Sequence, residues 1–282
     1  MIQDLKVLKM GATGNEDNMS NANNKDFILK KELAKMLNEF DNLCHENSLI
    51  YSVAYGTMLG CVRHEGFIPW DDDLDVFMPR KDYERLLALA DKNDRLSENL
   101  SLYFYNNHKA FPFIKIVNRN INLTEEWIDV DDNYYGLWID IFPLDKYIDD
   151  PKTVEVKNKI VNLYDKFRKT YIRYDHQSFF IKRILKNLRN YFYKSIYNRN
   201  KLCREIDDLA KIYIDEDVDV YSCFLERMYL FNSLETKRMK FEDFYVDCFA
   251  DYDRLLTEEY GDWKVLPPVS ERVNTHYIVR KK

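Results

Sequence analysis

A cluster of aspartates runs directly into an apolar segment near residue 70. Residues 66–79 read GFIPWDDDLDVFMP, with Asp71, Asp73 and Asp75 at alternate positions before and inside a predicted strand. Alternate side chains of a strand share a face, so these three carboxylates have the same parity. Close carboxylates repel one another, and burial adds to the cost of ionising them. A divalent cation removes that cost, and Mg²⁺ prefers oxygen ligands from carboxylates and substrate phosphates.

A further carboxylate lies in a second apolar run. Asp140 stands between two isoleucines in the segment GLWIDIF, where a charge is costly unless it is paired or bound to metal. We expect it to converge on the same Mg²⁺ or Mn²⁺. A solvated turn is the alternative for the DDD motif, and it would account for Asp71 and Asp72. It would not account for Asp75 or Asp140.

A Gly-Thr pair, Gly56 and Thr57, follows the β-rich run 49–55 and begins a short predicted helix. Backbone N–H groups at such a turn can bind phosphate, aided by the helix dipole, although glycine at a strand–helix turn is usually only conformational. Gly-Thr after one strand, Asp-x-Asp in a second and a single Asp in a later strand together form a known pattern. It is typical of polymerase-beta-like nucleotidyltransferases, whose carboxylates hold metal on nucleotide phosphates.

The elements that must position these groups alternate between helix and strand periodicity. Helices are predicted over 25–47 with Asn24 as N-cap, from Pro79 to about residue 92, over 152–214 and over 252–260. Strands are predicted over 49–55, 74–78, 101–106, 111–117, 136–142 (ended by Pro143) and in the runs RMYLF and FYVDCF. We therefore predict an α+β fold, a nucleotidyltransferase-like mixed sheet flanked by helices. The predicted parts are a mobile N-terminal arm (1–24), a catalytic core (25–150), a basic helical segment (151–215) and a C-terminal part that completes the active site (216–282).

Charge is distributed unevenly along the 282 residues. The net charge is −6, but residues 152–204 carry 15 Lys/Arg against 3 Asp/Glu, and the remainder carries 27 against 45. A strongly acidic remainder would repel nucleic acid, so we exclude it as a partner. Aromatic residues interleave the basic ones, as in helices that lie in a membrane interface, so one interpretation of residues 152–204 is peripheral contact with an anionic membrane. The alternative is a set of core helices with solvated basic faces.

Composition also predicts the compartment. Hydrophobic residues make up 46% of the chain, which is enough for a core and argues against disorder. No apolar run approaches the roughly 20 residues that span a bilayer, and no signal-peptide pattern is present. The five cysteines are widely spaced without a Cys-x-x-Cys motif, so we expect reduced thiols rather than a zinc site. We predict a cytoplasmic protein, peripheral at the inner membrane face.

The chemical motifs resemble one family closely. The run YGTMLGCVRHEGFIPWDDDLDVFMPRKDY is similar to the signature of the LicD family of phosphorylcholine transferases, and GLWIDIFPLD and EEYGDWKVLPPVSERVNTH resemble two further blocks. The resemblance implies transfer of a phospho-alcohol, typically phosphocholine from CDP-choline, to a hydroxyl of a surface glycan or its lipid-linked precursor, such as lipopolysaccharide or teichoic acid. Relatives with the same core, including the fukutin-related proteins, use CDP-ribitol.

The resemblance implies roles for individual residues. It matches the metal-binding acids to Asp71, Asp73, Asp75 and Asp140, the phosphate-binding turn to Gly56 and Thr57, and further substrate-binding positions to Arg63, His64, Arg272 and His276. Lys115, in the run PFIKI, is interpreted as a phosphate contact or a snorkelling edge residue. The sequence departs from the family at Tyr55, where a small residue is usual, and at Val117 and Ile121, where Arg and Thr are common.

These residues predict a mechanism in which an acceptor hydroxyl attacks the β-phosphorus of a CDP-alcohol and CMP leaves. Mg²⁺ would neutralise the diphosphate, Thr57 would position it, and Arg63 and Lys115 would offset developing charge. Either Asp73 or Asp140 would deprotonate the acceptor. Two alternatives stay open: a nucleotidyltransferase that moves an NMP group and releases pyrophosphate, and a non-catalytic, membrane-associated nucleotide-binding scaffold.

Overall fold

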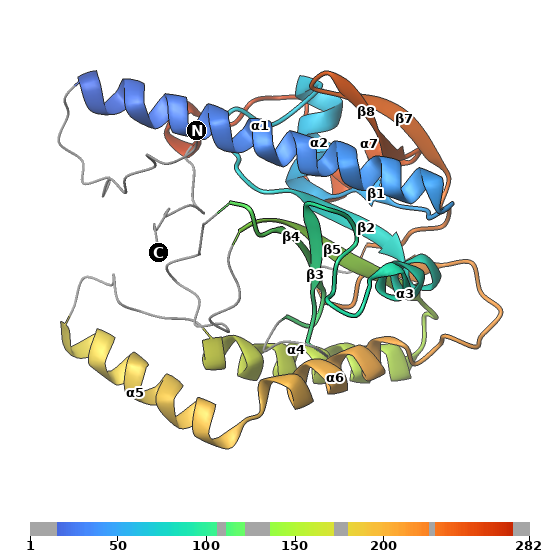
Figure 1. The fold of residues 1–282 in the computed structure, drawn as a ribbon. Helices are drawn as coiled ribbons and strands as arrows, with labels where there is room; N and C mark the ends of the chain where they lie inside the picture. Colours follow the sequence, from blue (N-terminus) through green and yellow to red (C-terminus); the bar gives the residue numbers. More distant parts are fainter. Residues whose placement is uncertain (1–15, 106–110, 122–135, 172–179, 226–228, 273–282) are drawn as a thin grey trace.

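The computed structural model describes residues 16–105, 111–121, 136–171, 180–225 and 229–272 (Figure 1). Within these ranges the fold is α+β, as predicted, with a six-stranded mixed sheet, a separate two-stranded hairpin and flanking helices. The helices are α1 (Glu16–Glu46), α2 (Tyr55–His64), α3 (Arg80–Leu89), α4 (Pro151–Tyr171), α5 (Phe180–Ile196), α6 (Arg199–Ala210) and α7 (Tyr252–Tyr260), with a 3-10 turn at Val269–Glu271. The strands are β1 (Ser52–Val53), β2 (Asp75–Pro79), β3 (Leu100–Tyr103), β4 (Ile114–Asn118), β5 (Leu137–Lys146), β6 (Tyr221–Ser222), β7 (Thr236–Phe241) and β8 (Phe244–Phe249).

The sheet has the order β1-β2-β5-β4-β3, and β6 pairs with the far end of β5. β2 and β5 are parallel, whereas β4 is antiparallel to both β5 and β3. Figure 1 shows α1 crossing on one side of this sheet together with α2, α7 and the β7–β8 hairpin, and α4 and α6 lying on the other side. The central strands are therefore covered on both faces, which explains their nearly continuous apolar runs.

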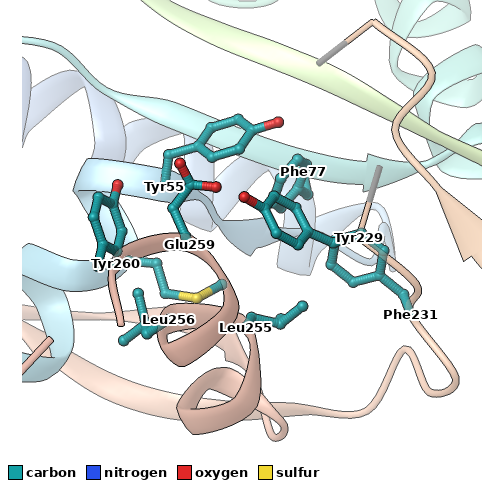
Figure 2. Close-up of a pocket in the computed structure, with 9 residues that line it drawn as sticks. Tyr55, Phe77, Tyr229, Phe231, Leu255, Leu256, Glu259 and Tyr260 are labelled. Atoms are coloured by element: carbon teal, nitrogen blue, oxygen red, sulfur yellow. The ribbon is translucent and has the colours of Figure 1, made fainter. Parts of the chain in front are cut away.

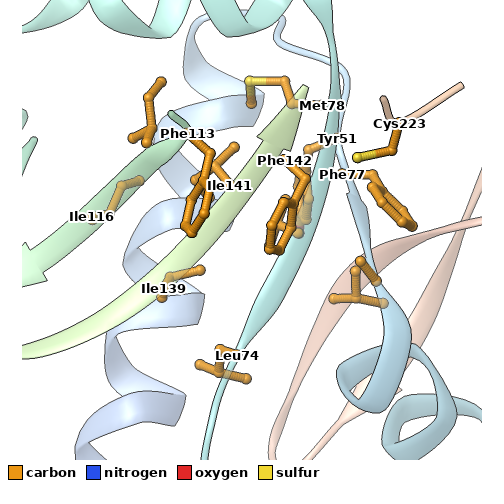
Figure 3. Packing of buried hydrophobic residues seen from close by; sticks show 14 of the residues in the cluster. Tyr51, Leu74, Phe77, Met78, Phe113, Ile116, Ile139, Ile141, Phe142 and Cys223 are labelled. Atoms are coloured by element: carbon orange, nitrogen blue, oxygen red, sulfur yellow. The ribbon is translucent and has the colours of Figure 1, made fainter. Parts of the chain in front are cut away.

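The core gathers where β2, β4 and β5 lie side by side. Figure 3 shows Phe77 and Met78 of β2 close to Ile139, Ile141 and Phe142 of β5. Each of these five side chains is at most 6% exposed. Because neighbouring strands hold these residues in register, the acidic positions on the same strands are held in register as well.

Two predicted boundaries were wrong. α1 begins at Glu16 rather than after Asn24, so part of the predicted arm is helical; the stretch before Asn24 contains no Gly or Pro that would end a helix beyond residue 16. β5 continues through Pro143 to Lys146. The pairing of β5 with β4 ends at Ile141, so the missing N–H of Pro143 leaves no ladder bond unmade on that side.

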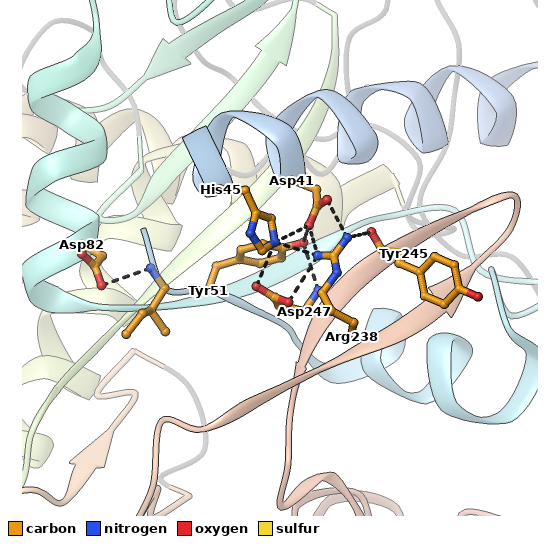
Figure 4. Close-up of polar contacts among 8 residues, drawn as sticks. Asp41, His45, Tyr51, Asp82, Arg238, Tyr245 and Asp247 are labelled. Carbon is orange, nitrogen blue, oxygen red and sulfur yellow. Dashed lines mark hydrogen bonds and ion pairs between the residues drawn. The ribbon is translucent and has the colours of Figure 1, made fainter. Parts of the chain in front are cut away.

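A polar cluster attaches the C-terminal hairpin to α1 (Figure 4). Arg238 of β7 donates to Asp41 of α1 at 2.9 Å and to Asp247 of β8 at 3.2 Å. The hydroxyl of Tyr51 donates to Asp41 and accepts from the backbone N–H of Asp247. Asp41, His45 and Asp247 are close enough to hold a cation, but the Arg238 guanidinium already lies between the two carboxylates. We interpret this cluster as structural.

Two further features of the described residues are the hydropathy of the helices and the state of the cysteines. No helix within the described ranges is both long and apolar enough to pass through a bilayer. All five cysteines are buried free thiols. Burial raises the pKa of Cys61 to about 12, so this thiol stays protonated at neutral pH.

Candidate active site

Asp75 and Asp140 lie directly opposite one another in the parallel pair β2–β5. Residues paired in register on neighbouring strands project to the same face, so two carboxylates meet near the start of β2. Burial raises the pKa of Asp75 well above its usual value, and the charges of Asp73, Asp140 and Asp71 raise it further. The structure thus brings together the four acids that the sequence singled out.

The loop before β2 adds Asp72, which the alternative of a solvated turn would have explained. Asp71, Asp72 and Asp73 each offer a carboxylate oxygen, and these oxygens lie within 4.8 Å of one another. Asp72 is only 1% exposed, and its backbone N–H donates to Asp71 at 3.1 Å. A purely solvated turn would not bury Asp72, so this alternative fails for the described geometry.

Gly56 and Thr57 hold the acidic loop against the start of α2. A Cβ on Gly56 would lie 2.6 Å from an oxygen of Asp71, so only glycine allows this carboxylate its position. The buried hydroxyl of Thr57 accepts from the backbone N–H of Asp75 at 2.9 Å. The Thr57 side chain therefore fixes β2 to α2. The groups that could make the predicted phosphate contact are the backbone N–H groups in the first turn of α2.

Lys115 is buried inside the sheet, not at its edge. It is the register partner of Asp140 in the antiparallel pair β4–β5, and its Nζ lies 2.7 Å from the Asp140 carboxylate. The ring centres of Phe111 and Trp138 lie 4.7 and 4.9 Å from the ammonium. Two roles were predicted for Lys115, and that of a snorkelling residue at the sheet edge was wrong, because β4 lies between β5 and β3. A charge contact to phosphate stays a prediction, and in the described structure the lysine pairs with Asp140.

Arg63 and His64 lie at the end of α2, next to the C-terminal part of the chain. Arg63 donates to the carbonyl of Trp263 at 2.8 Å and to the His64 ring at 3.4 Å. Burial and the charge of Arg63 both lower the pKa of His64, so this imidazole is neutral at pH 7. A neutral ring can accept a proton or a hydrogen bond.

The last described residue, Arg272, reaches the acidic loop through Trp70. Its guanidinium lies 5.3 Å from the centre of the Trp70 ring, and the rings of Trp70 and His64 lie perpendicular to one another with 6.3 Å between their centres. Burial lowers the pKa of Arg63, and the nearby charge of Arg272 lowers it further. His276 lies outside the described residues.

Tyr260 is a neighbour of the acids that the sequence did not single out. Burial raises its pKa, and so do the charges of Glu259, Asp75, Asp71 and Asp73. This tyrosine is the last residue of α7, so the C-terminal end of α7, shown with Tyr260 in Figure 2, lies near the carboxylate cluster. Tyr260 belongs to the predicted helix over 252–260 and to the beginning of the block EEYGDWKVLPPVSERVNTH, but its side chain was not singled out there.

This arrangement can bind a divalent cation and an anion together. The gathered donors are carboxylate oxygens, which is the set that Mg²⁺ and Mn²⁺ take and that zinc in structural sites does not. Gly56 and the first turn of α2 lie against Asp71, and the ammonium of Lys115 pairs with Asp140. Arg63 and Arg272 lie near one another beyond the end of α2. The residues therefore fit a metal that holds a phosphate.

Comparison with known proteins finds a family match that includes the acidic residues of this site. Residues 48–192 match the sequence model of a family described as LicD/FKTN/FKRP, nucleotidyltransferase domain. The chain is 28% identical over 262 residues to a lipopolysaccharide cholinephosphotransferase LicD of Haemophilus influenzae, which covers 86% of this chain and 92% of the relative. Shorter matches are an uncharacterized protein of Rickettsia prowazekii, 33% identical over 69 residues (24% of this chain, 26% of the relative), and one of Rickettsia typhi, 40% identical over 50 residues (18% and 16%).

Proposed function

The chain belongs to the LicD/FKTN/FKRP family of nucleotidyltransferase domains, and from this premise we propose that it is a metal-dependent phospho-alcohol transferase. The donor is a CDP-alcohol of the phosphocholine type, and the acceptor is a hydroxyl of a cell-surface glycan or its lipid-linked precursor. The observation that carries the proposal is the meeting of Asp75 and Asp140, with Asp71 and Asp73, inside the matched region. The name of the Haemophilus relative supports phosphocholine and lipopolysaccharide as the substrates.

Asp71, Asp73, Asp75 and Asp140 would hold Mg²⁺ or Mn²⁺. Such a cation neutralises a diphosphate and stabilises its leaving oxygen. Without it, several carboxylates at one site would repel the donor. The backbone at Gly56 and Thr57 binds the diphosphate at the beginning of α2, where the helix dipole favours anions.

The transfer step needs a base and a leaving group. The acceptor hydroxyl oxygen forms a bond to the β-phosphorus, the bond from that phosphorus to the bridging oxygen breaks, and CMP leaves with the electron pair. The hydroxyl proton passes to Asp73 or Asp140. Lys115 and Arg63 offset charge on the phosphoryl oxygens. For Lys115 this requires that its ammonium exchange part of its contact with Asp140 for the phosphate.

A panel assay tests the proposal. The protein is incubated with Mg²⁺, a lipid-linked or lipopolysaccharide acceptor, and CDP-choline, CDP-ethanolamine, CDP-glycerol or CDP-ribitol, and released CMP is measured. We expect CMP release that EDTA, Asp73→Asn and Asp75→Asn each abolish, whereas Asp217→Asn, an exposed aspartate after α6, has no effect.

The same assay distinguishes the alternatives. Pyrophosphate released from CTP, with no CMP from any CDP-alcohol, would replace the proposal with NMP transfer. Binding of nucleotide without any turnover would indicate a non-catalytic scaffold.

A further inference from the structure

Helix α5 turns its apolar side away from the protein. Six large apolar side chains of this helix are each between 41% and 75% exposed: Ile184, Leu185, Leu188, Tyr191, Phe192 and Ile196. At 3.6 residues per turn they fall within an arc of about 140° around the helix axis, which makes one continuous stripe. A stripe of this width on a surface helix normally faces the core of its own domain, whereas the stripe of α5 faces solvent.

The opposite side of α5 is held against α4 by polar and aromatic contacts. Asn190 is only 4% exposed, and the Lys169 ammonium of α4 lies 5.3 Å from the centre of the Tyr193 ring. The rings of Tyr193 and Tyr197 stack with 5.5 Å between their centres, and the ammonium of Lys166 lies 5.6 Å from the centre of the Tyr197 ring. These contacts fix the rotation of α5 about its axis, so the outward direction of the apolar stripe follows from how the helix is anchored.

One polar residue falls within the same arc of the described part of α5, and the helix itself satisfies it. The hydroxyl of Ser195 donates to the carbonyl of Phe192 at 2.8 Å. A hydroxyl that already has a hydrogen-bond partner can enter an apolar environment at a reduced cost. Ser195 therefore does not oppose burial of the stripe.

The stripe lies in the basic part of an otherwise acidic chain. Residues 180–204, from the start of α5 into α6, contain eight Lys/Arg and no Asp/Glu, whereas the other residues contain 34 Lys/Arg and 48 Asp/Glu. Arg189, which the same period places at one edge of the stripe, is exposed. The surface that covers the stripe must therefore combine apolar material with negative charge.

The neighbouring helices of the basic segment turn their apolar sides to the core. Side chains of α4 and α6 that are at most 5% exposed include Val156, Ile160, Phe167, Leu202 and Ile206. These two helices fit the alternative of core helices with solvated basic faces, which the sequence left open. Among the described helices of this segment, α5 is the one with a continuous exposed apolar stripe, so the interpretation as a membrane contact applies to α5 rather than to all of residues 152–204.

A second copy of the chain does not match this charge. Two α5 helices that packed through their stripes would each bring five Lys/Arg and no Asp/Glu to the contact. Like charges at such a contact repel one another, most strongly at low salt. An anionic lipid surface instead attracts each of these cations.

The length and charge of α5 determine how the helix would lie on such a surface. Its 17 residues measure about 26 Å at 1.5 Å per residue, which is less than the hydrocarbon core of a bilayer, and five of them carry a positive charge. An amphipathic helix that combines an apolar face containing Phe and Leu with Lys and Arg lies in the plane of the interface.

We propose that α5 is a membrane-docking helix that binds anionic lipid reversibly. Its apolar stripe enters the boundary between headgroups and acyl chains, and its lysines and arginines contact the anionic headgroups. Figure 1 shows α5 at the periphery of the fold, next to α4 and α6 and away from the sheet. The carboxylate cluster lies on and beside β2 and β5, so this inference does not depend on the proposed transfer reaction.

Vesicle co-sedimentation of the full chain tests the docking. At low salt we expect binding to vesicles that contain phosphatidylglycerol, and at least about ten-fold weaker binding to vesicles of phosphatidylcholine alone. Binding to the anionic vesicles should be lost as salt rises. Lys182→Gln with Lys186→Gln and Arg189→Gln should remove most of the difference between the two kinds of vesicle, because three of the five charges of α5 are then absent.

A charge-matched pair of variants tests the apolar stripe. Leu185→Glu with Phe192→Glu should lower the affinity for anionic vesicles by at least about ten-fold, since apolar burial and charge attraction are both reduced. The control is Leu89→Glu with Tyr245→Glu, which adds the same two charges at sites on α3 and β8 that are 41% and 56% exposed, and it should bind like the unchanged protein. All four sites are exposed, so both variants should keep the original melting temperature, which separates lost binding from lost folding.

A fluorescent probe locates the contact on the molecule. All five cysteines are buried, so a cysteine added at an exposed site can be labelled selectively with an environment-sensitive nitrobenzoxadiazole dye. On phosphatidylglycerol vesicles the dye at Leu188→Cys should become brighter and emit at shorter wavelength, because this site enters the interface. The dye at Tyr245→Cys should not respond.

Three results would overturn the docking helix. The first is the absence of sedimentation with phosphatidylglycerol vesicles at low salt. The second is a dye response at Tyr245→Cys without one at Leu188→Cys, because another surface would then contact the lipid. The third is a dimer, detected by light scattering, that Leu185→Glu with Phe192→Glu converts to monomer, because the stripe would then be a contact between two copies.

Discussion

Asp75 and Asp140 occupy paired positions on neighbouring parallel strands, and Lys115 pairs with Asp140 from the opposite side. Three ionisable side chains thus lie in one row across the middle of a buried sheet. The row contains one cation and two carboxylates, and the loop before β2 adds more acids. This excess of negative charge is the physical reason for our proposal that the site binds a divalent metal ion.

The first prediction concerns the pH dependence of stability without metal. The pKa of Asp75 is raised in the folded protein, so the folded protein keeps this proton to a higher pH than the unfolded chain, which releases it near 3.8. Stability therefore falls as pH rises from 3.8 through the folded pKa. In EDTA, Asp75→Asn should flatten this decline, as measured by urea unfolding between pH 5 and pH 8. Asp217→Asn should keep the wild-type slope, and an equally steep slope in Asp75→Asn would contradict the assignment.

The second prediction concerns the Lys115–Asp140 pair. Lys115→Met leaves Asp140 beside Asp75 without its cation, which should cost about 2–4 kcal/mol of unfolding free energy in EDTA. Adding Asp140→Asn should recover part of this loss, because the uncompensated charge is then removed. Mg²⁺ should also recover part of it in Lys115→Met. The same loss in the presence and absence of Asp140 would show that the two residues are not coupled.

The third prediction contrasts two glycines of α2. The Cβ of Gly56→Ala meets the Asp71 carboxylate at 2.6 Å, and this side chain can move away. The Cβ of Gly60→Ala meets the backbone carbonyl of Gly66 at 2.5 Å, which cannot move without shifting the loop. Gly56→Ala should therefore lose at least about ten-fold in CMP release with little change in melting temperature, and Gly60→Ala should lose about 1–3 kcal/mol of stability. Equal melting temperatures of both variants would refute the distinction.

The strands that carry the acids could be predicted because their signal is local. An apolar run after Asp73 and another around Asp140 each read as a buried strand on their own. The pairing of Lys115 with Asp140 could not be predicted, because it depends on the register between β4 and β5, 25 positions apart in the chain. A lysine between isoleucines gives the same local pattern at a sheet edge and in a sheet centre.

Missed and mistaken elements have similar causes. β7 was missed because three of the six residues in TKRMKF are Lys or Arg and the apolar residues show no strict alternation, so the strand is evident only from its pairing with β8. The predicted strand RMYLF gives only an isolated bridge between Phe231 and Tyr221 within the described residues. Tyr260 was overlooked because it ends a helix rich in acidic residues, which is typical of a solvated helix, and its place near the carboxylates depends on the packing of α7 against α2.

The last prediction concerns the buried ion network that holds β5 in place behind the site. Arg80, at the start of α3, donates to Asp145 of β5 at 2.6 and 2.8 Å and to Asp207 of α6 at 2.8 Å. All three side chains are at most 6% exposed, and burial raises the pKa of Asp145 despite its arginine partner.

Arg80→Met would leave Asp145 buried without its cation, although Asp207 keeps Lys211 at 2.7 Å, so it should cost about 3–5 kcal/mol in chemical denaturation. Arg85→Met, one turn further along α3, breaks a 2.7 Å pair with Asp82 in which the arginine is 45% exposed, and should cost at most about 1 kcal/mol. Adding Asp145→Asn to Arg80→Met should recover part of the loss. Similar losses for Arg80→Met and Arg85→Met would mean that the network contributes no more than a surface pair, and that β5 is positioned by its apolar contacts alone.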